Sequence, residues 1–139
     1  MPAVLPLVIV IASGIVYHLA QKVSDAPRPW SMLAVAYGAA FAITAVLAFT
    51  SSGADVARWS PRERAAGLLI GLAALGIEAG FFFIYRSGWP LASASVITNV
   101  VVTVILAVVG VVVFGERLTA FRGVGIVLAS VGAALIARP

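Results

Sequence analysis

The chain has 139 residues, of which 63% are hydrophobic and only 10% are charged, and this composition excludes an ordinary soluble domain, whose surface must be far more polar. Nine Lys and Arg stand against five Asp and Glu, but the basic residues are scattered, which excludes a nucleic-acid-binding stripe. There is no Cys, and His18 is the one histidine, so disulfides and thiolate or paired-histidine metal sites are excluded as well. We expect an all-α integral membrane protein with a single membrane domain, residues 1–139, in the inner or plasma membrane.

The first two apolar runs predict two transmembrane helices. Residues 3–20 are long enough to cross the hydrocarbon layer, which takes about 20 residues, and they lack the basic start and cleavage site of a signal peptide. Pro27 and Pro29 then interrupt any helix. A second helix is expected over residues 30–50.

Three further helices are expected in the rest of the chain. Ser60, Pro61 and Glu63 are typical of a helix start, with an N-cap, a proline in the first turn and an acid three residues after the cap. They predict a third helix over 62–85. A turn with Gly88 and Pro90 precedes a fourth helix over 91–114, and a polar turn precedes a fifth over 121–136.

All three tryptophans fall at predicted helix ends, at Trp30, Trp59 and Trp89. An indole at the membrane surface keeps its N–H among the headgroups and its ring at the acyl boundary. The tryptophans therefore favour these helix boundaries, although coincidence is an alternative.

The charges of the loops are nearly balanced between the two sides of the membrane. With five crossings, one side carries five basic residues (Arg58, Arg62, Arg64, Arg117, Arg122) and the other carries four (Lys22, Arg28, Arg86, Arg138). A fixed orientation normally shows a clear cytoplasmic excess of Lys and Arg. Two hypotheses stay open: insertion in both orientations, or an orientation with the N-terminus inside, decided by the longer loop.

Several motifs of the C-terminal half carry a family resemblance: Tyr85, residues 89–94 (WPLASA), residues 114–119 (FGERLT), residues 123–126 (GVGI) and Gly132. On these residues the chain resembles the drug/metabolite transporter (DMT) superfamily, specifically one five-helix EamA-type domain, and more distantly the small multidrug resistance transporters. The resemblance covers about residues 81–137. The N-terminal half is similar only in the number and spacing of its helices.

The resemblance implies a transporter whose working unit contains two repeats in opposite orientations around a central substrate cavity. A repeat with an odd number of crossings lies inverted when duplicated, and inverted repeats support alternating access. A single repeat must find its partner in a second chain, either in an antiparallel homodimer or in a heterodimer with a sister chain. Gly125, Ala129 and Gly132 form a small-residue seam on the last helix, which is the candidate dimer contact.

Glu78 is the main candidate for binding a proton or substrate. It falls about two-thirds of the way along the third helix, where a charged and unpaired carboxylate is costly, so it should face a cavity, find a cation or hold a proton. The small multidrug resistance proteins instead place their acid on the first helix, and the second run here has no counterpart. The structural alternative is a protonated Glu78 bonded to Asn99 or to a backbone carbonyl.

Helical spacing puts two aromatic residues, Phe82 and Tyr85, on the same stripe as Glu78. An aromatic lining beside a carboxylate suits an organic cation, and plain packing is the alternative. Small residues (Gly67, Gly71, Ala74) occupy the other end of this stripe, where they permit close helix approach.

Polar residues on two other helices are further candidates. Ser95, Asn99 and Thr103 share a face of the fourth helix and are expected to point into the bundle, either as cavity lining or as interhelical bonds. Tyr17 and His18 share a stripe of the first helix with Gly14 and Gln21. His18 lies about one turn from the interface, where it could relay protons or contact the headgroups. Tyr37 and Thr44 are weaker candidates, and Glu116 in the interfacial turn is interpreted as structural, capping the last helix or pairing with an arginine.

The chain shows no phosphate loop, no nucleophile beside a base, no metal-ligand cluster and no dinucleotide motif, so we expect neither an enzyme nor a cofactor. Two functions remain. The favoured one is a secondary transporter of small organic molecules, either metabolites or cationic drug-like compounds, with proton coupling. The alternative is a non-transporting membrane subunit that stabilises or regulates a partner protein.

Overall fold

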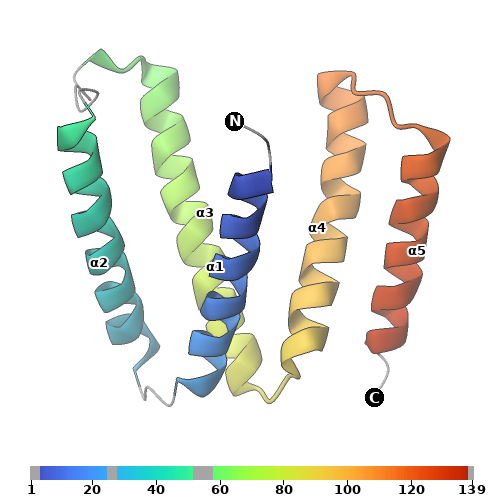
Figure 1. Cartoon of the computed structure of the whole chain (residues 1–139), viewed down its shortest axis with the longest axis horizontal. Helices are drawn as coiled ribbons and strands as arrows, with labels where there is room; N and C mark the ends of the chain where they lie inside the picture. Colours follow the sequence, from blue (N-terminus) through green and yellow to red (C-terminus); the bar gives the residue numbers. More distant parts are fainter. Residues whose placement is uncertain (1–3, 25–27, 52–57, 138–139) are drawn as a thin grey trace. The chain divides into compact units, whose positions relative to one another are not determined.

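A computed structural model of the chain consists of α-helices joined by short connections (Figure 1). The structure describes residues 4–24, 28–51 and 58–137, and these hold no strand. The all-α class is thereby confirmed. Arg138, counted above in the charge balance, lies outside the described residues. The helices are α1 (Val4–Val23), α2 (Pro29–Thr50), α3 (Pro61–Arg86), α4 (Leu91–Phe114) and α5 (Ala120–Ile136).

Helices α1 to α4 are each long and apolar enough to cross a membrane, with 20, 22, 26 and 24 residues. Helix α5 is apolar but shorter, at 17 residues, which corresponds to about 25 Å of helix. Large hydrophobic side chains point outward along these helices, and Phe121 and Phe49 are 89% and 81% exposed. Such a surface suits lipid rather than water, and the chain is an integral membrane protein.

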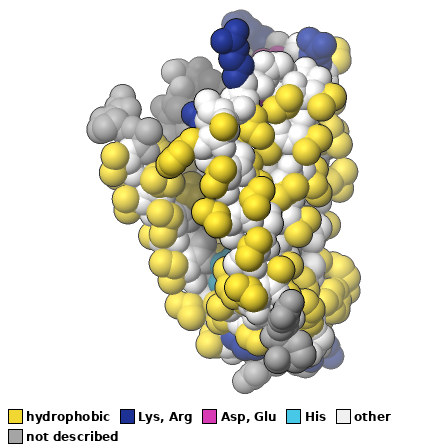
Figure 2. All heavy atoms as spheres, turned by 90° about the vertical axis from the view of Figure 1, so that its right-hand side faces the viewer, with side chains coloured by type: hydrophobic (Ala, Val, Ile, Leu, Met, Phe, Trp, Pro, Cys, Tyr) yellow, Lys and Arg dark blue, Asp and Glu magenta, His cyan; other side chains and the backbone are white. Residues whose placement is uncertain are grey.

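The side of the α4–α5 hairpin that Figure 2 turns toward the reader shows the same pattern. Hydrophobic side chains run along the helices, and Lys and Arg gather at the ends. This distribution matches an apolar layer between two headgroup regions.

The start of α3 forms the capping box that the sequence predicts. The backbone N–H of Ser60 donates to Oε2 of Glu63 at 2.7 Å, and the backbone N–H of Glu63 donates to the Ser60 hydroxyl at 3.3 Å. The Ser60 hydroxyl also donates to Oε2 of Glu63 at 2.8 Å. These bonds satisfy donors that the first turn of a helix leaves open.

The turn from α4 to α5 is shaped by two glycines and a threonine. Gly115 ends α4 with a φ of +65°, a left-handed conformation that favours glycine. The backbone N–H of Glu116 donates to the Gly110 carbonyl at 2.9 Å. Thr119 caps α5 by accepting a hydrogen bond from the backbone N–H of Arg122 at 3.3 Å. Thr119 is therefore the N-cap of α5. Of the two interpretations of Glu116, the one in which it caps this helix is wrong.

The chain forms two compact units, described separately below. Unit 1 contains Met1–Lys22 and Ile84–Pro139, with α1, the end of α3, α4 and α5. Unit 2 contains Val23–Phe83, with α2 and most of α3.

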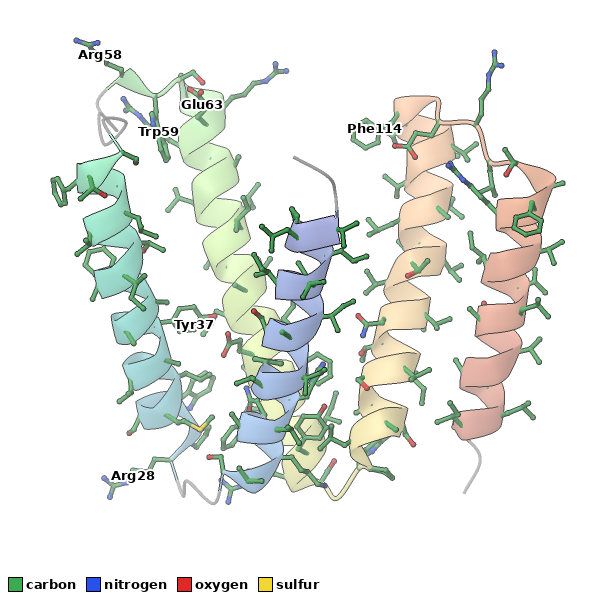
Figure 3. The ribbon with its side chains drawn as sticks, in the orientation of Figure 1. Arg28, Tyr37, Arg58, Trp59, Glu63 and Phe114 are labelled. Atoms are coloured by element: carbon green, nitrogen blue, oxygen red, sulfur yellow. The ribbon has the colours of Figure 1, made fainter. Side chains whose placement is uncertain are left out.

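In unit 2, the start of α2 contacts the later part of α3. The rings of Trp30 and Phe83 meet edge to face with centroids 6.2 Å apart, and Leu33 is buried. Figure 3 shows Arg28 at one end of this unit and Arg58 with Glu63 at the other. The charged ends and apolar middle are those of a membrane-spanning helix pair.

Candidate functional site

In unit 1, a polar cluster joins α1 to the end of α3. The Tyr85 hydroxyl oxygen lies 2.9 Å from Nδ1 of His18, and the two rings meet edge to face. The ring of Tyr17 stands edge to face against His18, with centroids 5.0 Å apart. Gln21 donates from Nε2 to the Tyr17 hydroxyl at 3.5 Å, a long hydrogen bond. Four polar residues from α1 and α3 therefore act together on one side of α1.

Lys22 continues this cluster at the end of α1. Its ammonium group donates to the Trp89 carbonyl at 3.0 Å and lies 5.8 Å from the centre of the Tyr85 ring. A cation over an aromatic face is attracted by the ring quadrupole. Lys22 thus ties α1 to the turn between α3 and α4.

Next to the cluster, α1 and α4 enclose an open pocket of about 500 Å³. His18, Ser95 and Asn99 are its polar residues, and the remainder of its lining is apolar or glycine. A pocket of this size with a few convergent polar groups is typical of sites for small organic ligands. The contact between Nδ1 of His18 and the Tyr85 hydroxyl holds the imidazole ring at the edge of this pocket.

The hydroxyl groups of α4 are already used within their own helix. Ser95 donates to the Leu91 carbonyl at 3.0 Å, and Thr103 donates to the Asn99 carbonyl at 2.7 Å. Asn99 is exposed and lines the pocket, whereas Thr103 is exposed and does not line it. Of the three candidates on α4, Asn99 is therefore the one whose side-chain amide suits ligand binding at this pocket.

In unit 2, Glu78 is half-buried on α3 and acts electrostatically on Tyr37 of α2. The Tyr37 hydroxyl is buried and has no hydrogen-bond partner among the described residues. Figure 3 shows the Tyr37 ring extending from α2 toward α3. Glu78 and Tyr37 thus place an acid and a phenol within electrostatic reach of each other inside the apolar span.

The stripe predicted on α3 is less exposed only in its second half. Phe82 and Tyr85 are buried, Ala74 and Glu78 are half-buried, and Gly67 and Gly71 are exposed. Phe82 is only 1% exposed, with its ring edge to face against Phe83, so it packs in the interior of unit 2.

The small-residue seam of α5 is largely exposed in the single chain. Gly125 and Ala129 are exposed and Gly132 is half-buried. A Cβ added at Gly125 or Gly132 would meet no atom within 4 Å. This seam leaves room for another helix to approach closely.

Tyr37 and Lys22 are more important to these clusters than the sequence pattern indicates. Tyr37 was a weak candidate, because α2 is apolar on all sides and its periodicity picks out no inner face. The sequence pattern identifies Lys22 only as a loop charge, because its bond to the Trp89 carbonyl joins residues 67 positions apart and no local pattern predicts it. Within residues 4–24, 28–51 and 58–137, no three acidic or histidine side chains come together as a metal site requires.

The profile of one protein family, described as the EamA-like transporter family, matches residues 1–138. Comparison with curated proteins and with solved structures returned no match.

Proposed function

Since the chain belongs to the EamA-like transporter family of the DMT superfamily, we propose that it is a secondary transporter that exports small organic molecules in exchange for protons. The members of this family are transporters and not enzymes. The main support for proton coupling is the position of Glu78, which is half-buried in a 26-residue membrane-spanning helix. Every other titratable group of that helix, Tyr85 included, lies in its first or last turn.

Glu78 and Tyr37 form the proposed coupling site. A charged carboxylate inside the membrane is costly, so it holds either a proton or a cationic group. The Tyr37 hydroxyl is buried without a protein partner among the described residues. It can therefore donate a hydrogen bond to a ligand. Proton and substrate therefore compete for the same carboxylate, which is the requirement for exchange.

The α1–α4 pocket is the proposed second contact for the substrate. His18 on α1 and Asn99 with Ser95 on α4 are the polar residues of its lining, and the remainder is apolar or glycine. These groups suit a molecule with one polar end and an apolar body. Tyr85 and Tyr17 position His18 and do not have to touch the substrate.

The proposed working unit is a dimer of inverted repeats. The nearly even charge balance supports an antiparallel homodimer, and a sister chain of opposite orientation would serve equally well. The seam of Gly125, Ala129 and Gly132, of which the first two are exposed and the third is half-buried, is the proposed dimer contact.

The proposal is tested by the protons released when a cation binds. Purified protein in weakly buffered detergent is mixed with tetraphenylphosphonium, an aromatic cation that matches the proposed site. We expect proton release from the wild type and none from Glu78→Gln. The matched control is Glu63→Gln, because Glu63 lies on the same helix but in its exposed first turn, and glutamine also serves in a capping box.

Equal proton release from wild type and Glu78→Gln would refute the coupling role of Glu78. If neither this cation nor a panel of amino acids and nucleosides bound or crossed the membrane, the alternative of a non-transporting partner subunit would be favoured.

A further inference from the structure

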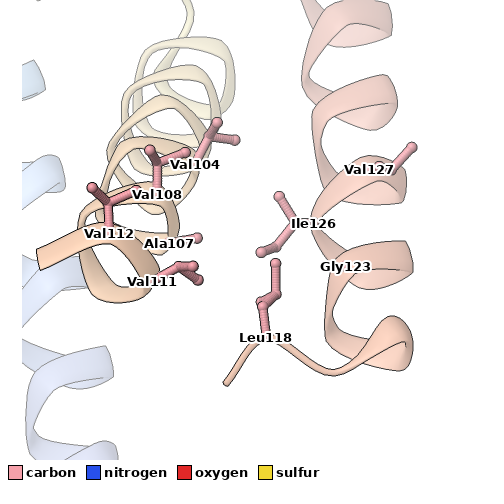
Figure 4. Close-up of a pocket in the computed structure, with 9 residues that line it drawn as sticks. All are labelled: Val104, Ala107, Val108, Val111, Val112, Leu118, Gly123, Ile126 and Val127. Atoms are coloured by element: carbon pink, nitrogen blue, oxygen red, sulfur yellow. The ribbon is translucent and has the colours of Figure 1, made fainter. Parts of the chain in front are cut away.

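A second, entirely apolar hollow lies in unit 1 between α4 and α5, away from the α1–α4 pocket. It has a volume of about 470 Å³, and Figure 4 shows Leu118 and Ile126 facing a row of valines on α4. Val104 also lines a neighbouring hollow of about 330 Å³, so the two continue along the same groove. No charged or hydrogen-bonding side chain lines the larger hollow. It therefore suits a hydrocarbon and not a polar substrate.

The length of the larger hollow matches one leaflet of a bilayer. Its α4 lining runs from Val104 to Val112, which is about 12 Å of helix. Half of the hydrocarbon core is about 15 Å thick. One acyl chain from the nearer leaflet can lie along this groove.

Two arginines stand where the headgroup of that lipid would lie. Arg117 precedes Leu118, and Arg122 precedes Gly123, two residues that line the hollow at its end near the α4–α5 turn. Arg122 also lies one turn before Ile126 on the same face of α5. Both arginines are exposed. They offer charge complementarity to a phosphate at the membrane surface.

Glu116, the acidic residue of the α4–α5 turn, lies away from the groove. A Cβ at Gly110 would come within 2.9 Å of Oε2 of Glu116, so this carboxylate rests against the glycine. Gly110 is buried on a side of α4 that does not line the hollow. The glycine thus leaves space for the Glu116 carboxylate against α4, on a side of the helix that does not line the hollow.

We propose that the α4–α5 groove binds an anionic phospholipid of the surrounding membrane, with one acyl chain between the helices and its phosphate at Arg117 and Arg122. The site depends on the membrane location of the chain and not on the transport mechanism.

Native mass spectrometry of the full chain in detergent tests this site with two lipids of equal chains, dioleoyl phosphatidylglycerol and dioleoyl phosphatidylcholine. We expect tighter binding of phosphatidylglycerol to the wild type. In the double variant Arg117→Gln/Arg122→Gln this affinity should fall by about 30-fold, the effect of two basic residues at an anionic lipid surface. The control Arg28→Gln/Arg62→Gln removes two exposed charges from unit 2 and should leave the affinity within about threefold.

The acyl chain is tested by filling the groove. Val108→Trp should weaken binding of both lipids, whereas Leu106→Trp, at an exposed position of the same helix that does not line the hollow, should not. An equal loss of affinity for phosphatidylglycerol in the Arg117/Arg122 and Arg28/Arg62 double variants would show unspecific electrostatic attraction and would overturn the proposed site. So would displacement of phosphatidylglycerol by an equal concentration of glycerol phosphate, which would indicate a water-soluble ligand. If Val108→Trp disrupted the dimer and spared lipid binding, the groove would belong to a second copy and the proposal would fail.

Discussion

The Tyr85 hydroxyl oxygen and Nδ1 of His18 lie 2.9 Å apart, although the two residues are 67 positions apart in the chain. This contact joins α1 to the end of α3 within unit 1. It also holds the His18 ring beside the α1–α4 pocket. The contact is thus both a structural link and a positioning device for the proposed substrate site.

Tyr85→Phe should destabilise the protein by about 0.6–1 kcal/mol, because it removes one buried hydrogen bond within the membrane. The free energy of unfolding, measured by SDS titration in mixed micelles, checks this value. Tyr37→Phe is the matched control, because the Tyr37 hydroxyl is buried without a partner among the described residues. That change should be neutral or stabilising. Equal losses in the two variants would contradict the assignment.

Ser60→Ala should cost about 1 kcal/mol, because Ser60 caps α3 and bonds to Glu63 from both its backbone and its side chain. Ser87→Ala at the other end of α3 removes a hydroxyl that donates to the Ile84 carbonyl, and it should change stability by less than about 0.5 kcal/mol. Thermal unfolding of both variants in detergent compares them. A larger loss from Ser87→Ala would count against the capping box.

Gly115→Ala should destabilise the α4–α5 turn by about 1–2 kcal/mol, because alanine is strained at a φ of +65°. Gly71→Ala on α3 should be neutral or stabilise by up to about 1 kcal/mol, because a helix favours alanine and the added Cβ meets no atom within 4 Å. The same unfolding measurement separates the two glycines. A loss at Gly71 as large as that at Gly115 would indicate that a partner helix packs there.

Single cysteines at Arg62 and Arg86 report the orientation of the chain, since the natural sequence has no cysteine. For an antiparallel homodimer, an impermeant maleimide should label each site from both sides of the membrane. Labelling of each site from one side only would exclude that homodimer and require a sister chain.

The sequence predicts those parts of the fold that depend on local interactions. Ser60, Pro61 and Glu63 predict the start of α3, because a capping box involves residues three positions apart. Long apolar runs predict the helices, because a segment that crosses the hydrocarbon layer finds no water there. Its backbone N–H and C=O groups must therefore bond to each other, as they do in a helix. The end of α1 was placed too early, at residue 20 against Val23, because Gln21 and Lys22 are polar and still helical.

The candidate site is harder to predict, because its contacts join distant parts of the chain. Helical spacing places Glu78, Phe82 and Tyr85 on one stripe, and these three are less exposed than most of α3. The roles of Tyr37 and Lys22 depend on which helix lies beside them. In a membrane protein, apolar residues face both lipid and neighbouring helices, so the hydrophobic pattern carries little information about the inner face.

Uptake into liposomes tests the central claim most directly. Protein is reconstituted in vesicles with an acidic interior, and accumulation of tetraphenylphosphonium is followed without a membrane potential. The wild type and Glu63→Gln should accumulate the cation as protons leave, and Glu78→Gln should accumulate none. Uptake by Glu78→Gln at the wild-type rate would contradict the account, because exchange would then proceed without the carboxylate that the described part of the chain places inside a span.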